Sequence, residues 1–518
     1  MNKKILLTIL LSVQMIFCLA SEPDSLKNVS LSSFDLLKIN NPWLNTSNPA
    51  GLFKIKDVMP STINLGLYLE DGDYKRVQQG DNIMHYRFLT ESYLNLHKFN
   101  LFGSFKYDKS YESNLDYSCI NNPFRNTPYT MIDTIGGDKC DREFFTVKGG
   151  FSVPLSEKLT LGGGVVYNIG LSSQDRDPRP QNKVLDFSVT SGLMYSLDKF
   201  NFGLNFIYEY YNEDIDVKII AENEYSTLFQ IHGPGMFNYH RASSFARLYT
   251  NDGYGLDAQI NYDNGDFNTL FGAKVLFSKE EVHDGRKAAN ASWSVSKFDS
   301  KFEGLDVNVY NHTTINNGLS IHAISANAII KTYLGTEIIQ KLEQVGNTDL
   351  EQWVTYAEEE KYGSTHIDAK LIYNFIRLKN KYNKNYGVKL AVNYFSFEEK
   401  YYLPEQAQSY ENLLASIYFD KSFYLGKSVF SVSAGCKYKT NLSGKQDFEQ
   451  TNFIVDKLLI PDFKYLTDSY YAPGLMISYE KNLTKYFDEF FINTNVDLIR
   501  ASNDASRVIV NFTFGVNF

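Results

Sequence analysis

Charged residues and prolines gather in one short segment, between positions 175 and 182. An arginine guanidinium there could bind the carboxylate or phosphate of a ligand through paired hydrogen bonds. Alternatively, the aspartates and arginines could pair with one another and hold a loop in place, and we favour this structural interpretation. A second short motif occurs in an earlier loop. The candidate loop residues are Asp177, Pro178, Arg179, Pro180 and Asn182, together with Gly136, Gly137 and Asp138 of the second motif.

Two cysteines, Cys119 and Cys140, fall in the same predicted loop. In an oxidising envelope their spacing favours a disulfide that closes the loop. Such a bond would stabilise the fold by about 3 kcal/mol in the loop-entropy picture. Two free thiols are the alternative. Cys436 falls on the apolar face of a predicted strand, where we expect an inert, buried thiol.

No motif indicates a metal or a cofactor, and we predict neither. The eight histidines contain no His-x-x-x-His pair, which a tight zinc site would favour. The sequence also has no Gly-x-Ser-x-Gly elbow and no phosphate-binding glycine loop. The acidic runs at 280–284 and 358–360 are typical of solvated loops or of cation sites that bridge lipopolysaccharide. We therefore predict that the chain is not an enzyme.

The elements that would position these residues are strands, because apolar and polar residues alternate along most of the chain. Residues 200–210 and 386–394 show this period of two clearly. A soluble sandwich would alternate in the same way. Three features favour a membrane barrel instead. Aromatic residues gather at the strand ends of the apolar face, small and polar residues dominate the other face, and short connections alternate with long ones.

Strands can cross a lipid bilayer only as a closed barrel, since every backbone amide there must be paired within the protein. We therefore predict an all-β, transmembrane, antiparallel up-and-down β-barrel with short periplasmic turns and long extracellular loops. It has about 18 strands, with about 16 or 20 as alternatives. The strands are expected at 61–70, 83–97, 98–111, 144–154, 158–171, 184–197, 200–216, 253–263, 267–281, 298–312, 318–335, 363–377, 385–400, 410–422, 427–440, 469–481, 488–500 and 506–518.

The N-terminal residues have the pattern of an export signal. Lys3 and Lys4 precede an apolar stretch, and Cys18 and Ala20 supply small residues for a peptidase. We predict a cleaved signal peptide at 1–20, and the stretch is short for an uncleaved membrane anchor. Residues 21–60 are mostly polar and predict a periplasmic leader or a plug segment folded into the lumen. Residues 61–518 would then form the barrel.

The last strand ends on an aromatic residue. It resembles the terminal strand of bacterial outer-membrane proteins, which the barrel-insertion machinery reads, whereas a soluble edge strand is the alternative. The predicted membrane-insertion signal comprises Phe512, Phe514, Val516 and Phe518.

The composition is acidic and aromatic. The 518 residues include 51 Lys and Arg against 60 Asp and Glu, a net charge of −9, and 15% are aromatic. Disordered chains are poor in aromatic residues, so disorder is excluded. A nucleic-acid partner would need a basic face, so none is expected.

Two loops and the leader contain short motifs of unusual composition. They are Asp175-Arg176-Asp177-Pro178-Arg179-Pro180-Gln181-Asn182, Pro128-Tyr129, Ile135-Gly136-Gly137-Asp138, Trp43 and Asn48-Pro49-Ala50-Gly51-Leu52. Together they resemble an uncharacterised family of outer-membrane β-barrel proteins from Bacteroidota. The resemblance implies a role near nutrient uptake, beside TonB-dependent receptors. The last of these motifs also resembles, more weakly, the start of long-chain fatty-acid transporters and their relatives.

The leading functional prediction is an outer-membrane channel or accessory uptake component for an unidentified nutrient, because a barrel of about 16 to 18 strands can enclose an aqueous lumen. The alternative is a non-conducting binding module for a TonB-dependent receptor or a surface ligand. An envelope hydrolase with a loop-borne site is third. We expect the chain in the cell outer membrane of a Gram-negative bacterium, in contact with its lipid and lipopolysaccharide.

Overall fold

The computed structural model describes most of the chain after residue 30. The predicted signal peptide and His97, the predicted end of the second strand, lie outside the described residues. The described ranges are 31–55, 60–96, 98–221, 224–285, 296–346, 351–380, 383–449, 451–483 and 487–518.

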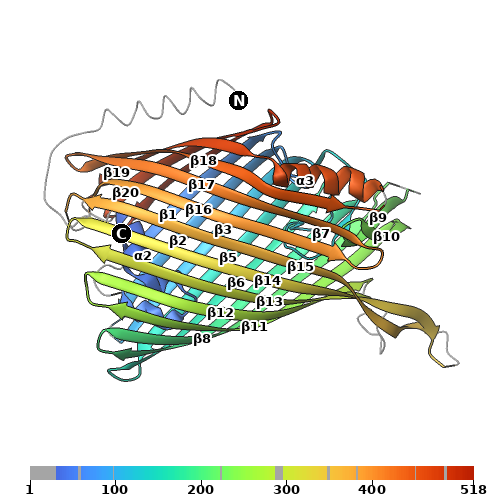
Figure 1. The fold of residues 1–518 in the computed structure, drawn as a ribbon, viewed down its shortest axis with the longest axis horizontal. Helices are drawn as coiled ribbons and strands as arrows, with labels where there is room; N and C mark the ends of the chain where they lie inside the picture. The colour runs from blue at the N-terminus through green and yellow to red at the C-terminus, as the bar shows by residue number, and fades with distance from the viewer. Residues whose placement is uncertain are drawn as a thin grey trace.

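Eighteen antiparallel strands form one closed barrel (Figure 1). Each strand of the wall pairs with the next one along the chain. The pair β8 and β11 follows this rule because β9 and β10 belong to another sheet, and pairing of β1 with β21 closes the barrel. The strands are β1 (Ser61–Gly72), β2 (Asn82–Leu96), β3 (Phe99–Leu115), β5 (Asp138–Pro154), β6 (Leu159–Gln174), β7 (Arg179–Leu197), β8 (Phe200–Lys218), β11 (Ser244–Asp263), β12 (Phe267–Asp284), β13 (Lys297–Asn316), β14 (Ser320–Gln344), β15 (Glu351–Leu378), β16 (Lys384–Tyr401), β17 (Gln406–Leu425), β18 (Ser428–Asp447), β19 (Tyr470–Asn482), β20 (Glu489–Ala501) and β21 (Ser506–Asn517).

The barrel and its strand number confirm the prediction from the alternating pattern. Several strands are longer than predicted at the end opposite the short turns, which we call the long-loop end. There β14 and β15 continue as a hairpin that projects beyond the wall (Figure 1). Their register extends to Gln344 and Glu351. Beyond the wall, neither face of this hairpin borders the lumen, so its sequence has no need of the alternation that marks a membrane-spanning strand.

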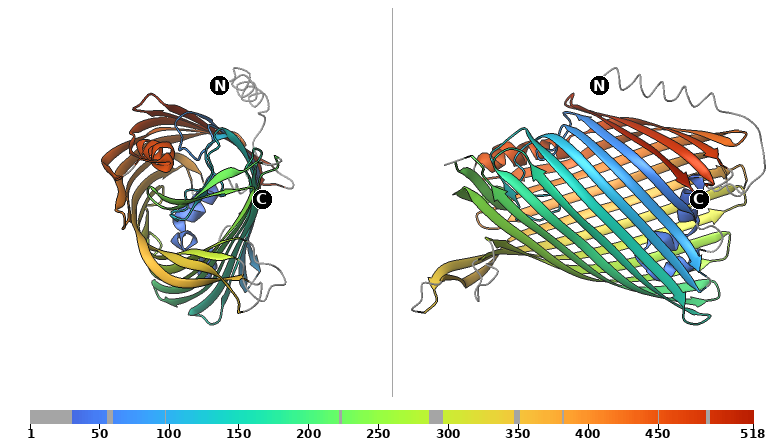
Figure 2. Two further views of the ribbon diagram at one scale, coloured as in Figure 1. Left: turned by 90° about the vertical axis from the view of Figure 1, so that its right-hand side faces the viewer. Right: turned by 180° about the vertical axis from the view of Figure 1, so that it is seen from behind.

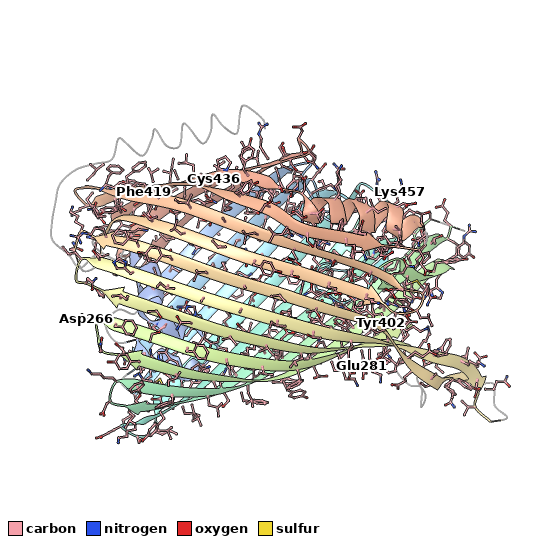
Figure 3. All side chains as sticks on the ribbon, in the orientation of Figure 1. Asp266, Glu281, Tyr402, Phe419, Cys436 and Lys457 are labelled. Carbon is pink, nitrogen blue, oxygen red and sulfur yellow. The ribbon has the colours of Figure 1, made fainter. Side chains whose placement is uncertain are left out.

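The two faces of the wall differ as the alternation predicts. On β8, the side chain of Leu204 points outward and is 52% exposed, while its neighbour Asn205 points inward and is fully buried. Cys436 pairs in register with the outward-facing Ile417 and therefore lies on the apolar exterior, where it is only partly buried rather than buried as predicted. Figure 3 shows Cys436 and Phe419 along this wall. Apolar side chains outside and polar ones inside are what a lipid environment requires of a barrel.

A second, three-stranded sheet lies at the long-loop end, and the sequence did not indicate it. It has the order β10 (Met236–Ala242), β9 (Ser226–Gly233) and β4 (Met131–Ile132). A π-helical turn, η3 (Val455–Leu459), and the helix α3 (Ile460–Thr467) are at the same end. The segments predicted as loops at 217–252 and 441–468 are thus largely ordered elements.

Short helical elements occupy the opposite end, inside the barrel (Figure 2). They are α2 (Leu31–Asn40), η1 (Pro42–Asn45) and η2 (Pro49–Lys54). The η2 helix begins at Pro49, because the side chain of Asn48 accepts a hydrogen bond from the Ala50 amide and proline fits the first helical position. Among the described residues, no helix is long and apolar enough to cross a membrane.

Candidate functional site

The N-terminal segment, residues 36–55, is anchored to the inner wall at the short-turn end. Trp43 is 2% exposed and packs with Ala50 and with three wall residues, Met194, Leu270 and Tyr310. Its indole Nε1 donates a hydrogen bond to Asn261 Oδ1 at 3.2 Å. A buried tryptophan with its nitrogen satisfied is a strong anchor for a short segment.

Polar side chains of the wall hold the same segment through its next residues. Asn48 Nδ2 donates to Gln259 Oε1 at 3.0 Å, and Asn205 Nδ2 donates to the Ser47 carbonyl at 3.0 Å. Ser47 Oγ donates to Asp257 Oδ2 at 2.5 Å. The inward face of β8 and β11 therefore recognises the segment in detail.

Two glycines allow η2 to approach the wall closely. Gly162 of β6 and Gly192 of β7 are paired in register. A Cβ at Gly162 would overlap the backbone of Pro49 and Ala50, and one at Gly192 would overlap Asn48 Oδ1. Only glycine permits this approach of backbone to wall.

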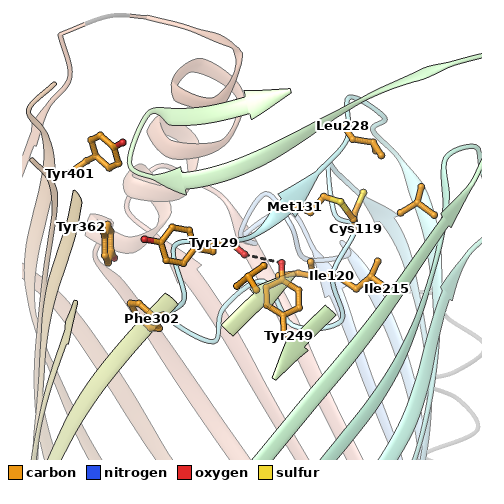
Figure 4. Close-up of a cluster of buried hydrophobic side chains, with 12 residues drawn as sticks. Cys119, Ile120, Tyr129, Met131, Ile215, Leu228, Tyr249, Phe302, Tyr362 and Tyr401 are labelled. Carbon is orange, nitrogen blue, oxygen red and sulfur yellow. Dashed lines mark hydrogen bonds between the residues drawn. The ribbon is translucent and has the colours of Figure 1, made fainter. Parts of the chain in front are cut away.

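A second segment fills the lumen at the long-loop end. The infolded loop, residues 116–137, runs between β3 and β5 and turns inward. Cys119, Ile120, Tyr129 and Met131 pack there against inward-facing side chains of the wall (Figure 4). Those wall residues are Ile215, Val217, Tyr249, Val282, Phe302, Tyr362 and Tyr401, and Leu228 of β9 joins them.

A buried ionic network joins the infolded loop to the wall. Arg247 of β11 is fully buried, and its guanidinium donates to Asp284 at 2.7 and 3.0 Å and to Asp299 at 3.1 Å. It also reaches the Thr130 carbonyl at 3.4 Å. The Tyr249 hydroxyl donates to the Tyr129 carbonyl at 2.8 Å (Figure 4).

The predicted loop motifs meet one another at this end. Arg179 Nε donates to Asp177 Oδ1 at 2.8 Å, and Asp177 Oδ2 accepts from the amides of Ile220 and Ala221, both at 2.9 Å. Arg176 Nη1 donates to the Gly136 carbonyl at 3.2 Å. These bonds hold loop ends together, and a ligand-binding role for the motif stays a prediction.

Part of the motif was placed wrongly. Arg179, Pro180 and Asn182 were expected in a loop but belong to β7, where they pair with Lys218, Val217 and Ile215 of β8. Asp138, also expected in a loop, is the first residue of β5 and pairs with Leu115 of β3. Pro180 has no partner on β6, whose pairing with β7 begins at Gln181. Proline lacks an amide hydrogen, so it is tolerated at that strand end.

The predicted disulfide is not formed in the structure. Cys119 and Cys140 are both free and buried. The Cys119 thiol instead faces Asp133, with 3.6 Å between Sγ and Oδ2. The packing of the infolded loop therefore directs Cys119 into the apolar cluster rather than toward β5.

Burial raises the pKa of Asp133 to about 7, although the Ile135 amide and the Cys119 thiol both favour its charged form. Because this folded pKa lies above the unfolded value, Asp133 contributes stability to the docked loop that is complete below about pH 4 and is lost as the pH rises through 7. The full contribution would be about 4 kcal/mol.

We expect amide exchange in the infolded loop, corrected for its intrinsic rate, to accelerate between pH 4 and 8, and to do so much less in Asp133→Asn. Asp175→Asn, in an exposed position outside the infolded loop, is the matched control and should behave as the wild type does. Equal pH profiles for the wild type and Asp133→Asn would contradict this assignment.

Within the described ranges, no group of three or more His, Cys, Asp and Glu side chains could hold a metal ion. The arrangement instead offers two lumen-filling segments, each anchored by buried polar contacts. Sequence reasoning missed Arg125, Arg247 and Asp299, which carry the contacts at the long-loop end. An arginine on the inward face of a predicted strand would have been the signal for Arg247, but residues 244–252 were assigned to a loop. Arg125 lies between two predicted strands and gave no such signal.

A closed antiparallel barrel with an apolar exterior and a polar interior has the architecture of the outer-membrane β-barrel class. Within this class, the chain belongs to DUF6850, a family of unknown function, which matches residues 49–518. The match assigns no source organism and no loop motif.

Several solved outer-membrane proteins match the chain at very low identity and low TM-score. The transporter YddB from Escherichia coli is 8% identical, with 88% of this chain and 81% of that chain covered and a TM-score of 0.40. BauA, the ferric preacinetobactin receptor from Acinetobacter baumannii, is 9% identical, with 89% and 80% covered and a TM-score of 0.39. The RagAB peptide importer is 7% identical, with 90% and 87% covered and a TM-score of 0.37. No curated protein matches the chain. These values identify neither a substrate nor a role.

Proposed function

We propose that the chain is an outer-membrane uptake barrel that is closed at rest by two inward-folded segments. The observation that carries the proposal is the anchoring of Trp43 and Asn48 on inward-facing residues of β11. A segment that served only as a leader would need no such matched partners. The infolded loop, docked on Tyr249 and Arg247, closes the other end in the same way.

The apolar exterior and the terminal strand support the membrane location. The C-terminal Phe518 exchanges backbone hydrogen bonds with Ser61, at 2.9 and 3.0 Å, and Phe514 and Phe518 are both exposed on the outside. We propose that Phe512, Phe514, Val516 and Phe518 are read by the barrel-insertion machinery.

Residues 1–20 would be removed on export, and residues 21–60 would act as the plug. The loop motif supports a Bacteroidota origin and a TonB-dependent receptor as partner.

Gly162→Val tests the plug directly. Its side chain would overlap the backbone of η2, which cannot yield as a flexible side chain can. Overpacking of this kind costs about 1–3 kcal/mol, so we expect the open fraction in single-channel recordings to rise about tenfold to a hundredfold over a mostly closed wild type. Gly103→Val is the matched control, because a Cβ there meets nothing within 4 Å.

A non-conducting binding module is the second candidate. It is favoured by a cavity of about 400 Å³ at the long-loop end, lined by residues that include Arg76, Phe124, Glu399 and Tyr410. In this case neither the wild type nor Gly162→Val would conduct, although both would show the heat-modifiable gel mobility of a folded barrel. A wild type with large, permanently open conductance would contradict both candidates.

A further inference from the structure

Four inward-facing side chains at the long-loop end form a site that we call the cation cage: Tyr211, Glu213, Tyr249 and Glu280. Strand register brings them together, because Glu213 of β8 pairs directly with Tyr249 of β11. Tyr211 and Glu280 both pair with Asn251, two residues further along β11. Two carboxylates and two aromatic rings therefore face one point of the lumen.

The cage concentrates negative charge in a buried place. Glu213 is fully buried and Glu280 is 1% exposed. The Tyr211 hydroxyl donates to Glu213 Oε2 at 2.6 Å, and the Asn121 amide donates to Glu213 Oε1 at 2.7 Å. Two buried carboxylates require a cation for compensation.

The cation in the closed state is Arg125, from the tip of the infolded loop. Its guanidinium carbon lies 4.4 Å from the ring centroid of Tyr249 and 4.9 Å from that of Tyr211. Its Nη1 donates to Glu280 Oε2, and its Nε lies 4.0 Å from Glu213 Oε2. A planar cation between aromatic faces and carboxylates is the geometry that favours guanidinium over ammonium.

Arg125 fills the cage without satisfying it. Its Nε and Nη2, and Oε1 of Glu280, have no hydrogen-bond partner among the described residues. A guanidinium that is free of the loop backbone could rotate to form paired bonds with the carboxylate, which are stronger than the one bond that Arg125 makes. The cage therefore has a carboxylate oxygen, Glu280 Oε1, that Arg125 leaves without a hydrogen bond and that another guanidinium could use.

The tip of the infolded loop also borders the 400 Å³ cavity. Phe124, next to Arg125, lines that cavity, and the Arg76 guanidinium lies 4.0 Å from its ring centroid. Pro123 and Asn126 line it as well. A ligand that occupies the cavity thus contacts the same turn, residues 123–126, that carries Arg125.

We propose that the cation cage is a binding site for the guanidinium group of a ligand, and that Arg125 occupies it as an internal competitor. A ligand guanidinium displaces Arg125 and thereby releases the infolded loop from the wall. The consequence for transport rests on the proposed plugged barrel, whereas the binding step can be measured without it.

The test is calorimetric titration of methylguanidinium into the detergent-solubilised full-length barrel. Arg125→Ala should bind it with a Kd about tenfold or more below that of the wild type, because the competitor is gone. Arg125→Ala combined with Glu280→Gln should lose that gain. Arg241→Ala is the matched control, because it also removes a guanidinium that lies over a tyrosine ring, 6.0 Å from the Tyr225 centroid. Arg241 is exposed and lies outside the cage, so its loss should leave the Kd unchanged. Urea, a neutral molecule of the same shape, should not bind.

Further titrations test whether the guanidinium group belongs to a free small molecule or to a peptide. L-arginine and the peptide Gly-Arg-Gly, with Gly-Gly-Gly as its blank, distinguish a free small molecule from a peptide. Arg125→Gln replaces the alanine variant if the latter lacks the gel mobility of a folded barrel. Equal affinity in the wild type and Arg125→Ala, or binding that survives Glu280→Gln, would overturn the proposal. Neither result would alter the conductance expected of Gly162→Val, so the two proposals can fail separately.

Discussion

Replacing Trp43 with alanine is expected to free the N-terminal segment from the lumen while the barrel stays folded. The indole packs with Ala50, Met194 and Leu270 and is almost completely buried. Removing such a side chain costs about 3–5 kcal/mol. The cost weakens the docking of the segment rather than the folding of the barrel, because the wall is held closed by its own strand pairing. The amides of Gly51 and Ile55 donate to the carbonyls of Asn48 and Leu52 at the two ends of η2. Their exchange should accelerate about a hundredfold or more.

Two controls make this expectation specific. Trp43→Phe keeps most of the apolar contact and loses the bond to Asn261, so its effect should be about 1–2 kcal/mol. Trp353→Ala lies on the projecting hairpin of β15 and should leave exchange in η2 unchanged. Slow exchange in Trp43→Ala would show that the segment is held by other contacts and would remove the main support for a displaceable plug.

The wall of this protein could be predicted from its sequence because lipid imposes a strict pattern. Leu204 and Phe206 must face outward and Asn205 inward, and this alternation is visible within a few residues. The alternation no longer predicts strands outside the bilayer. Arg247 and Tyr249 lie on β11 beyond the predicted start of that strand at residue 253, where both faces meet protein or water.

The lumen contacts could not be predicted, because they join residues far apart in the sequence. Trp43 and Asn261 are separated by 218 positions, and nothing local to either residue indicates the other. The motif at Asp177 attracted attention through its unusual composition, yet its contacts join loop ends to one another and reach neither the lumen nor the cavity. By contrast, Arg125 looks ordinary in the sequence. Glu280 belongs to the acidic run that was expected in a solvated loop, yet it is buried on β12. Both residues acquire their roles only from strand register.

Arg247→Met is expected to undock the infolded loop with an effect as large as that of Trp43→Ala at the other end. The arginine is fully buried between Asp284 and Asp299. Removing one member of a buried ionic network costs about 3–5 kcal/mol, since the remaining charges lose their partner. Exchange of the amides of Cys119 and Ile231, which bond to the Met131 and Thr130 carbonyls, should rise about a hundredfold or more.

A compensated variant distinguishes unpaired charge from lost packing. If the penalty is electrostatic, Arg247→Met combined with Asp284→Asn and Asp299→Asn should recover much of the protection, because well-packed neutral residues often replace a buried ionic network at little cost. Arg179→Ala removes an exposed pair with Asp177 and should change protection by less than about 1 kcal/mol. Unchanged exchange in Arg247→Met would mean that the apolar cluster around Tyr129 holds the loop without the network.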